Sequence, residues 1–557
     1  MDTITDFPHP TLGIVRGWTS PSTRQFLGLR YATLTGKWAP PVISEGDPKG
    51  IVDATTLGPS VPSPPNGIDI EFSRIQRPLP HPELQQSDVE CLNLNITTPK
   101  AVSAGVNLPV IVFIHGGGFA IGANSWPQYD FRRLIELSVR EQQPVIGVNI
   151  NYRLGALGFL TSKELVSHGY KQNNGLLDQR TALLWIKRHI VGFGGNPDDM
   201  TIVGQSAGGG LLYPRLRYKP WVDTGAVVLV SATHHLQSEV PLFKRMVSMS
   251  GTNLLLKPLP EQVTECTYKA IVARLGLASW PATERVNALV QMDTQKLLQA
   301  SSPTDALLPA VGGKLGLNPH TYAGFHQGSS GSLNIPGRKW CEEIMIGDCQ
   351  MDASILSTML NQEKEGIASA FRESLTRSLG SADKAKQVLA AYAITEDIPG
   401  DDAFEAILRF ANDISFFIPV LNYGQCWSGK AFIYHFNEPN SWDGPWKGYA
   451  THILDVSYLF QNYNEALSEP QRAVASQFAL DLIAFSSGCA PWPKFKWETK
   501  DLHARLYGGK GADTSGKVAT VLIPHSSTER SGTIFNLTRS IPADDLSRAW
   551  GIFMAGH

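Results

Sequence analysis

The chain lacks several features that would place it in a specialised class of protein. It has six cysteines, but no two of them have the CxxC spacing of a redox motif or a structural metal site. Its 48 basic and 50 acidic residues leave a net charge of -2, so neither nucleic acid nor an anionic membrane surface is expected as a partner. The N-terminal residues have neither the basic region nor the apolar core of a signal peptide, and no apolar run is long enough to span a bilayer.

These absences favour a soluble, cytoplasmic enzyme with mostly free thiols. The N-glycosylation sequons at Asn95 and Asn536 are then expected to be chance matches. The chain has 557 residues, of which 42% are hydrophobic and 18% charged, so it can bury a large core. We expect a single domain over residues 1–557.

The most informative stretch is Gly204-Gln-Ser206-Ala-Gly208, which follows the apolar segment Met200–Val203. A strand that ends in such a tight turn can hold the serine hydroxyl clear of the backbone, where it can attack a carbonyl. In a chain with 51 glycines the pattern is weak on its own, and an ordinary glycine-rich loop is the alternative. It becomes specific only if an oxyanion hole is present and an acid and a histidine follow the serine in that order.

A second glycine-rich turn lies upstream of the serine. The apolar run Leu108–Ile114 is predicted to be a central strand, and it leads into His115-Gly-Gly-Gly-Phe119. Consecutive glycines expose backbone N–H groups that can point at a developing oxyanion. The alternative is a phosphate-binding loop, but the Gly-Lys-Ser/Thr that should follow it is missing.

Between the two turns, strand patterns alternate with a helical one. Pro144–Ile150 and Met200–Val203 are predicted to be buried strands, and Asn174–His189 has the apolar spacing of an amphipathic helix. This order predicts parallel strands joined by a right-handed crossover, with His189 as a helix-end residue. Residues 56–88 are rich in Pro, Gly and Ser, which predicts a long surface loop.

Together these motifs resemble those of the type B carboxylesterases, the family that also contains cholinesterases and fungal lipases. The resemblance covers most of the chain and is densest from residue 90 to 210. It implies an α/β-hydrolase fold, which is a large, mostly parallel sheet with an antiparallel N-terminal edge and helices on both faces. The matching stretches are Phe26–Ala32, Glu90–Ile96, His115–Phe119, Asn151–Gly155, Gly175–Arg180, Gly192–Pro197 and Gly204–Gly209.

The resemblance also implies a catalytic triad in the order serine, acid, histidine. Ser206 matches the nucleophile, Asp352 the acid and His452 the base, although most members of the family carry Glu at the position of Asp352. Asp348 is a rival for the acid, and Asp352 could instead be a helix N-terminal acid. His435 lies within a predicted strand and is expected to be a sheet residue.

The implied activity is hydrolysis of a small-molecule carboxylic ester through an acyl-enzyme, without a cofactor or a metal. The backbone N–H groups of Gly117, Gly118 and Ala207 are expected to form the oxyanion hole. The alternatives are a lipase acting on long-chain acyl esters and a catalytically impaired, adhesion-like binding relative. The sequence indicates neither an oligomeric state nor which acyl and alcohol groups are accepted.

The chain departs from the family just after the nucleophile. In the family, a characteristic stretch follows the nucleophile directly. Here the matching stretch is Ser231–Leu236, and residues 210–229 separate it from the serine. The displacing segment contains Pro214 and Pro220, each of which would break a helix at a cost of roughly 3 kcal/mol. We expect residues 210–229 to be an insertion, such as a translated intron. The alternative is a genuine lid or substrate loop.

Two further departures concern a disulfide and the substrate. In the family, the cysteine that matches Cys91 pairs with an upstream one, but Gly58–Pro62 contains no cysteine, so Cys91 is expected to be free. Gln205 stands where cholinesterases carry Glu, and residues 60–90 contain no Trp. A choline site is therefore not expected.

Overall fold

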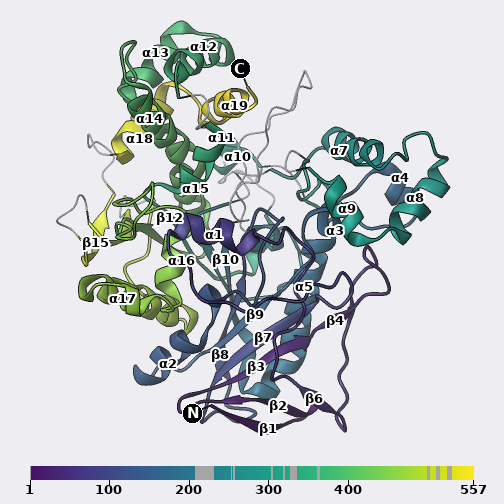
Figure 1. The fold of residues 1–557 in the computed structure, drawn as a ribbon. Coiled ribbons are helices and arrows are strands. Elements are labelled where there is room, and N and C mark those ends of the chain that lie inside the picture. The colour runs from purple at the N-terminus through teal and green to yellow at the C-terminus, as the bar shows by residue number, and fades with distance from the viewer. Residues whose placement is uncertain are drawn as a thin grey trace.

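The structure, a computed structural model, describes residues 2–206, 231–252, 254, 257–302, 305–317, 320–326, 335–360, 364–497, 502–509, 515–523 and 530–556. A single large sheet runs through it in the order β1-β2-β3-β7-β9-β8-β10-β11-β12-β13-β14-β15, with β6 beside β2 (Figure 1). The strands are β1 (Thr3–His9), β2 (Gly13–Thr19), β3 (Thr23–Arg30), β6 (Ile51–Asp53), β7 (Asn93–Pro99), β8 (Leu108–Ile114), β9 (Ile146–Ile150), β10 (Gly195–Gln205), β11 (Arg245–Met249), β12 (Glu343–Cys349), β13 (Lys430–Phe436), β14 (His503–Tyr507) and β15 (Val518–Leu522).

The direction of the strands changes across the sheet. Neighbouring strands from β9 to β14 are parallel. Strands β1, β2, β3, β7 and β9 pair antiparallel, as do β14 and β15. The predicted fold class, a mostly parallel sheet with an antiparallel N-terminal edge, is confirmed. β9 and β10 run parallel as predicted, but β8 lies between them.

The central strands are apolar on both faces because the sheet is covered on both sides. In β8, Val110, Val112 and Ile114 join one hydrophobic cluster, whereas Ile111 and Phe113 join the other. This alternation explains why the strand appears in the sequence as a continuous apolar run. The first cluster includes α5 (Asn174–His189), and the second includes α2 (Arg132–Arg140) and α17 (Glu469–Ser486), which lie on the opposite side of the sheet in Figure 1.

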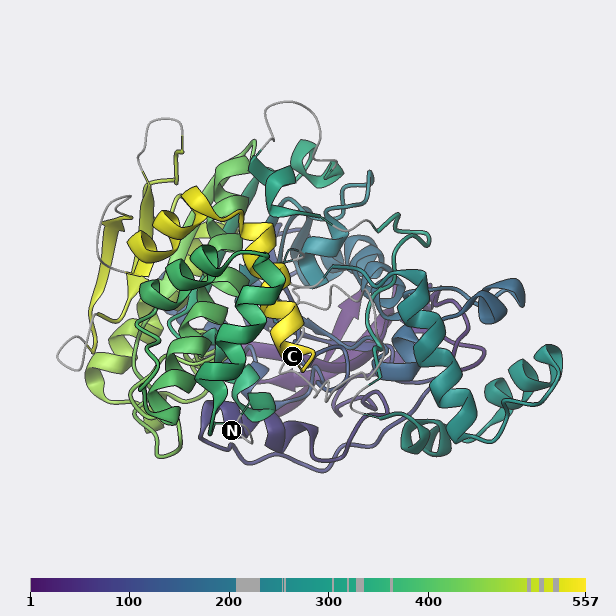
Figure 2. The same ribbon diagram turned by 90° about the horizontal axis from the view of Figure 1, so that it is seen from above.

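Most of the remaining helices gather above the sheet, whereas α16 packs beside α17 (Figure 1). Seen from above, the green and yellow helices of the C-terminal half lie on one side, and the teal helices α7 to α9 lie on the other (Figure 2). The helices are α3 (Gly155–Phe159), α4 (Lys163–Ser167), α6 (Ser231–His235), α7 (Glu261–Arg274), α8 (Ala282–Gln291), α9 (Thr294–Ala300), α10 (Tyr322–His326), α11 (Ser357–Leu360), α12 (Ile367–Leu379), α13 (Ala382–Ala391), α14 (Gly400–Asn412), α15 (Ile418–Cys426), α16 (Leu454–Leu459), α18 (Arg530–Ser540) and α19 (Ala543–Met554).

The segment predicted to be a long surface loop, residues 56–88, contains a helix, α1 (Gly67–Ile75), so that prediction is wrong for this part. Ile68, Phe72 and Ile75 are buried and recur with helical spacing, which fixes the helix against the body of the protein. In the sequence, the Pro and Gly residues around this helix obscured the helical spacing of its apolar residues.

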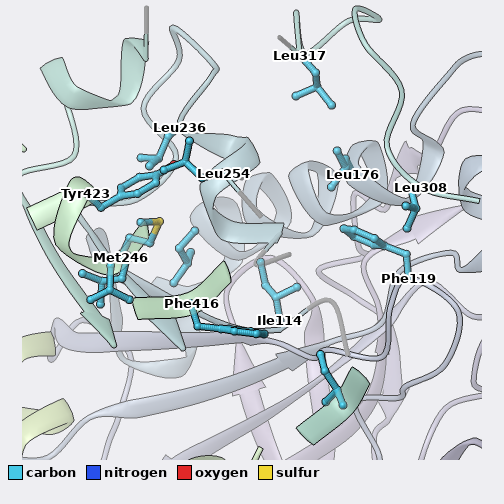
Figure 3. Packing of buried hydrophobic residues seen from close by; sticks show 14 of the residues in the cluster. Ile114, Phe119, Leu176, Leu236, Met246, Leu254, Leu308, Leu317, Phe416 and Tyr423 are labelled. Carbon is cyan, nitrogen blue, oxygen red and sulfur yellow. The ribbon is translucent and has the colours of Figure 1, made fainter. Parts of the chain in front are cut away.

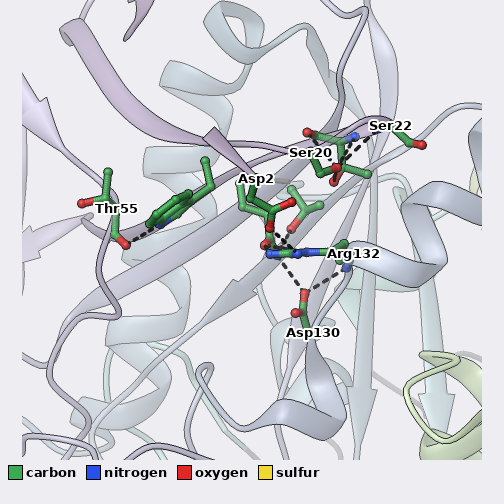
Figure 4. Close-up of polar contacts among 10 residues, drawn as sticks. Asp2, Ser20, Ser22, Thr55, Asp130 and Arg132 are labelled. Carbon is green, nitrogen blue, oxygen red and sulfur yellow. Dashed lines mark hydrogen bonds and ion pairs between the residues drawn. The ribbon is translucent and has the colours of Figure 1, made fainter. Parts of the chain in front are cut away.

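The N-terminal strands are tied to α2 by polar contacts (Figure 4). Arg132 at the start of α2 donates from Nη1 to Asp2 Oδ2 at 2.7 Å, and its backbone N–H donates to Asp130 Oδ1 at 2.9 Å. In the same group of strands, the Trp18 indole donates to the Thr55 carbonyl at 2.8 Å. The bonds of Arg132 thus tie the N-terminal edge of the sheet to α2, and the bond of Trp18 ties it to the segment after β6. No helix among the described residues is long and apolar enough to cross a membrane.

Candidate active site

Ser206 lies at the carboxyl end of β10, between the neighbouring strands β8 and β11. Its φ angle is 25°, which an L-residue other than glycine rarely adopts and which carries strain. Its N–H donates to the carbonyl of Met249 at the end of β11, at 3.0 Å, and its side chain is almost completely buried. A strained serine at the end of a central parallel strand is the geometry that the Gly-x-Ser-x-Gly pattern predicts.

Asp352 follows β12 and lies against the loop that carries His452. Asp352 Oδ1 is 2.7 Å from His452 Nδ1, and its Oδ2 accepts from the Cys349 N–H at 2.7 Å. The two loops also join through the backbone, because Met351 N–H donates to the Ala450 carbonyl at 2.8 Å. Both carboxylate oxygens are therefore used. The imidazole is held with Nδ1 toward the acid and Nε2 away from it.

The other imidazole nitrogen of His452 faces the residue that precedes the serine. Gln205 Nε2 lies 3.3 Å from His452 Nε2. If Nδ1–H donates to Asp352, Nε2 carries the lone pair that accepts from this amide. The structure thus brings Asp352 and His452 together and places the histidine against the turn of Ser206. Sequence reasoning missed the contact of Gln205, whose only signal was its position directly before the serine.

Burial dominates the electrostatics of the acid. The pKa of Asp352 is raised above its usual range by loss of solvent, and the hydrogen bond from His452 opposes this rise. Asp455, in the first turn of α16 just after His452, is also buried, and burial raises its pKa to about 7. The Tyr434 hydroxyl donates to Asp455 at 3.1 Å, so this second carboxyl group has a partner of its own.

The rival acid, Asp348, has a different histidine. Its Oδ1 lies 2.5 Å from Nδ1 of His435, and the two residues are opposite each other on β12 and β13. His435 is therefore a residue of the sheet, as predicted. His189 ends α5, where its Nδ1 lies 2.7 Å from Thr11 Oγ1.

The glycine loop packs directly against the serine turn. A Cβ atom on Gly116 would lie 2.8 Å from the Ser206 carbonyl oxygen, so only glycine allows this approach. Gly117 and Gly118 have φ angles of 110° and 62°. Within the described part of the chain, neither N–H donates to another backbone group. The assignment of these two N–H groups to an oxyanion hole therefore stays a prediction. Ala207, the third predicted donor, and the predicted insertion at residues 210–229 lie outside the described residues.

The stretch Asn151–Gly155 clamps both ends of the glycine loop. The Tyr152 hydroxyl donates to the His115 carbonyl at 2.9 Å, and Gly155 N–H donates to the Phe119 carbonyl at 2.6 Å. Figure 3 shows the Phe119 ring near Leu308 and Leu176 of α5, in the same hydrophobic cluster. Backbone bonds and packing together fix the direction of the loop.

A buried ion pair anchors this clamp. Arg153 donates to both oxygens of Asp178 on α5, at 2.8 Å and 2.7 Å, and neither side chain is exposed. The same guanidinium donates to the carbonyls of Lys37 and Ala39. These hydrogen bonds offset the cost of burying the two charges.

No cluster of three or more His, Cys, Asp or Glu side chains suited to a metal ion occurs among the described residues. All six cysteines carry free thiols, and Cys91 is buried. The arrangement offers a buried serine and a nearby histidine oriented by an acid, a set that suits nucleophilic attack on a carbonyl.

The sheet and the loops at its carboxyl end define an α/β-hydrolase. A model of the "Carboxylesterase family" matches residues 8–485, and the chain belongs to this family. It is 27% identical to Lipase 3 of Yarrowia lipolytica over 494 residues, covering 85% of this chain and 86% of that protein. It is 26% identical to para-nitrobenzyl esterase of Bacillus subtilis over 511 residues, covering 88% of this chain and 92% of that protein.

Solved structures agree on the fold. One structure of a PNB esterase superposes with a TM-score of 0.69 at 22% sequence identity, covering 94% of this chain and 98% of that chain. At this identity the likeness supports the fold alone.

Proposed function

We propose that this protein hydrolyses carboxylic esters through Ser206. The observation that carries the proposal is the arrangement around His452, whose Nδ1 is 2.7 Å from Asp352 and whose Nε2 faces the residue before the serine. Membership of the carboxylesterase family supports the same reaction.

In the proposed reaction, the Ser206 hydroxyl oxygen attacks the ester carbonyl carbon, and His452 Nε2 accepts the hydroxyl proton. Asp352 keeps the imidazole in the required tautomer and stabilises its cation. The N–H groups of Gly117, Gly118 and Ala207 bind the oxyanion of the tetrahedral intermediate. Removing one such donor typically costs about 3 kcal/mol of transition-state stabilisation.

The intermediate collapses when the bond between the carbonyl carbon and the alkoxy oxygen breaks. The leaving alcohol takes the proton from the imidazolium, and the acyl group stays on the serine. Water then attacks the acyl-enzyme with His452 again as the base. This second half releases the carboxylic acid and restores the serine hydroxyl.

Hydrolysis of p-nitrophenyl acetate and butyrate by the purified protein and by Ser206→Ala, from about pH 5 to 9, tests the proposal. We expect kcat/KM of the wild type to rise over the range in which a histidine base loses its proton, and no hydrolysis by the variant. Equal hydrolysis by both proteins would refute the role of Ser206. A folded wild type that hydrolyses neither ester would refute the proposed activity on short esters.

A lipase acting on long acyl chains is the second candidate, and the similarity to Lipase 3 of Yarrowia lipolytica favours it. Rates on tributyrin and triolein, measured below and above the solubility limit, separate the two. A sharp rise in rate when the substrate becomes an emulsion supports the lipase. Saturation below the solubility limit, with a preference for tributyrin, supports the short-chain esterase.

A further inference from the structure

A surface cavity of about 580 Å³ lies beside α5, and none of the three predicted triad residues lines it. One wall is the outer face of α5, including Leu177, Arg180 and Leu184. The other walls are residues 237–240, which follow α6, and residues 314–316, with Pro40 and Pro41 at the edge. The volume is in the range of small-molecule sites.

Much of the lining is apolar and open to water. Leu184 is 40% exposed and Val240 is 50% exposed, and both belong to the cavity wall. Leu177 and Leu315 add further apolar surface to the same cavity. A concave site with such walls gains free energy when an aliphatic group displaces water from them.

The cavity also contains a cation without a carboxylate partner. Arg180 donates from Nη1 to Ser238 Oγ at 3.0 Å, and no acid of the described chain forms an ion pair with it. Burial lowers the pKa of its guanidinium, as expected for a partly desolvated charge with no anion beside it. By contrast, Arg153 and Arg285 each have a carboxylate within 2.7 Å.

The remaining charges decide which anion fits. Lys314 adds a second positive charge to the lining, and Glu239 adds one negative charge. One half-buried guanidinium offers a planar pair of donors that matches a carboxylate. The acidic residue disfavours a multiply charged anion such as phosphate.

We propose that this cavity binds a small amphipathic carboxylate, with the carboxylate group on Arg180 and the aliphatic part against Leu184 and Val240. This binding does not depend on the proposed hydrolysis. The cavity is linked to α6, because residues 237–240 continue from this helix and His235 Nε2 lies 2.9 Å from Gln179 Oε1 on α5.

Calorimetric titration with octanoate, beside octylamine and octan-1-ol as probes of matched length, tests the proposal. We expect octanoate to bind and each of the two other probes to bind at least about tenfold more weakly, since neither carries an anionic group that can form a charge-assisted bond with the guanidinium. Equal binding of octanoate and octanol, or no binding of octanoate, would overturn it.

Two variants locate the binding. Arg180→Gln removes the charge, and Val240→Glu places a negative charge on the exposed wall. Arg140→Gln, on α2, is the matched control. We expect both cavity variants to weaken octanoate binding about tenfold or more and the control to leave it unchanged. If Arg180→Gln fails to fold, Val240→Glu decides alone. A folded cavity variant that binds octanoate with the affinity of the wild type would contradict the proposal.

Discussion

Nδ1 of His435 lies 2.5 Å from Oδ1 of Asp348, which makes this one of two histidine–aspartate pairs found among the described residues. The other pair joins His452 to Asp352 at 2.7 Å. This second pair reaches the turn of Ser206 through Gln205. Each aspartate contacts a histidine, but Asp352 lies beside the proposed base and Asp348 lies within the sheet. Substituting each of them in turn therefore tests which carboxylate supports catalysis.

Asp352→Asn should lower kcat for p-nitrophenyl butyrate by about 10⁴-fold, because an amide at this position no longer fixes the required tautomer of His452. Asp348→Asn should lower kcat by less than about tenfold and reduce the free energy of unfolding by about 1–3 kcal/mol. Steady-state kinetics and urea unfolding of both variants measure these effects. Equal losses of kcat would show that the acid has been assigned to the wrong residue.

Tyr152→Phe should lower kcat about tenfold with little change in KM. Its hydroxyl holds the His115 carbonyl at 2.9 Å and so steadies the loop that carries Gly117 and Gly118. A loss of about 1.4 kcal/mol in transition-state stabilisation corresponds to this factor. Tyr170→Phe is the control, since its hydroxyl makes no hydrogen bond to the described residues. An unchanged kcat in Tyr152→Phe would show that the clamp does not matter for turnover.

Glu71→Gln should flatten part of the dependence of stability on pH. Glu71 lies buried on α1, accepts hydrogen bonds from Gln128 and the Tyr129 hydroxyl, and burial raises its pKa from 4.5 to about 7. Because the folded-state pKa is raised, its stabilising contribution is complete below about pH 4.5 and is lost as pH rises through 7.

The difference between a pKa of 4.5 and one of about 7 corresponds to roughly 3 kcal/mol. The free energies of unfolding of wild type and Glu71→Gln, measured in urea, differ by some amount at each pH. We expect this difference to change by about 3 kcal/mol between pH 4.5 and pH 8. Glu83→Gln, an exposed acid of the same segment, should behave as the wild type. Identical pH dependence in wild type and Glu71→Gln would contradict the argument.

Deletion of residues 210–229 should give a folded protein that hydrolyses p-nitrophenyl butyrate at least as fast as the full chain. The segment displaces the Ser231–Leu236 match and contains two prolines, which is the basis for predicting an insertion. Circular dichroism checks folding, and sequencing the transcript checks for an intron. A folded deletion variant without activity would favour a lid or substrate loop.

The sequence predicted the elements whose apolar pattern is strong. α5 and β8 have the predicted bounds, because burial on one face of a helix or on both faces of a strand leaves a clear apolar pattern. α1 was missed because Pro and Gly surround it, although Ile68, Phe72 and Ile75 carry its period.

The contacts of the site depend on pairings across long stretches of chain. His435 meets Asp348 through the register of β12 and β13, which no local pattern reveals. The contact between Gln205 and His452 likewise depends on where the loop after β13 returns to the sheet.

Covalent labelling with a biotinylated fluorophosphonate tests the central claim most directly, since an activated serine oxygen displaces fluoride from phosphorus and stays attached. Ser250, which also has a positive φ of 55° and lies at the end of the neighbouring strand, is the matched serine. We predict one label per chain on the peptide that contains Ser206, loss of labelling in Ser206→Ala, and retained labelling in Ser250→Ala. A folded protein that takes up no label, or a Ser206→Ala variant that is labelled as fast as the wild type, would contradict the assignment of Ser206 as the nucleophile.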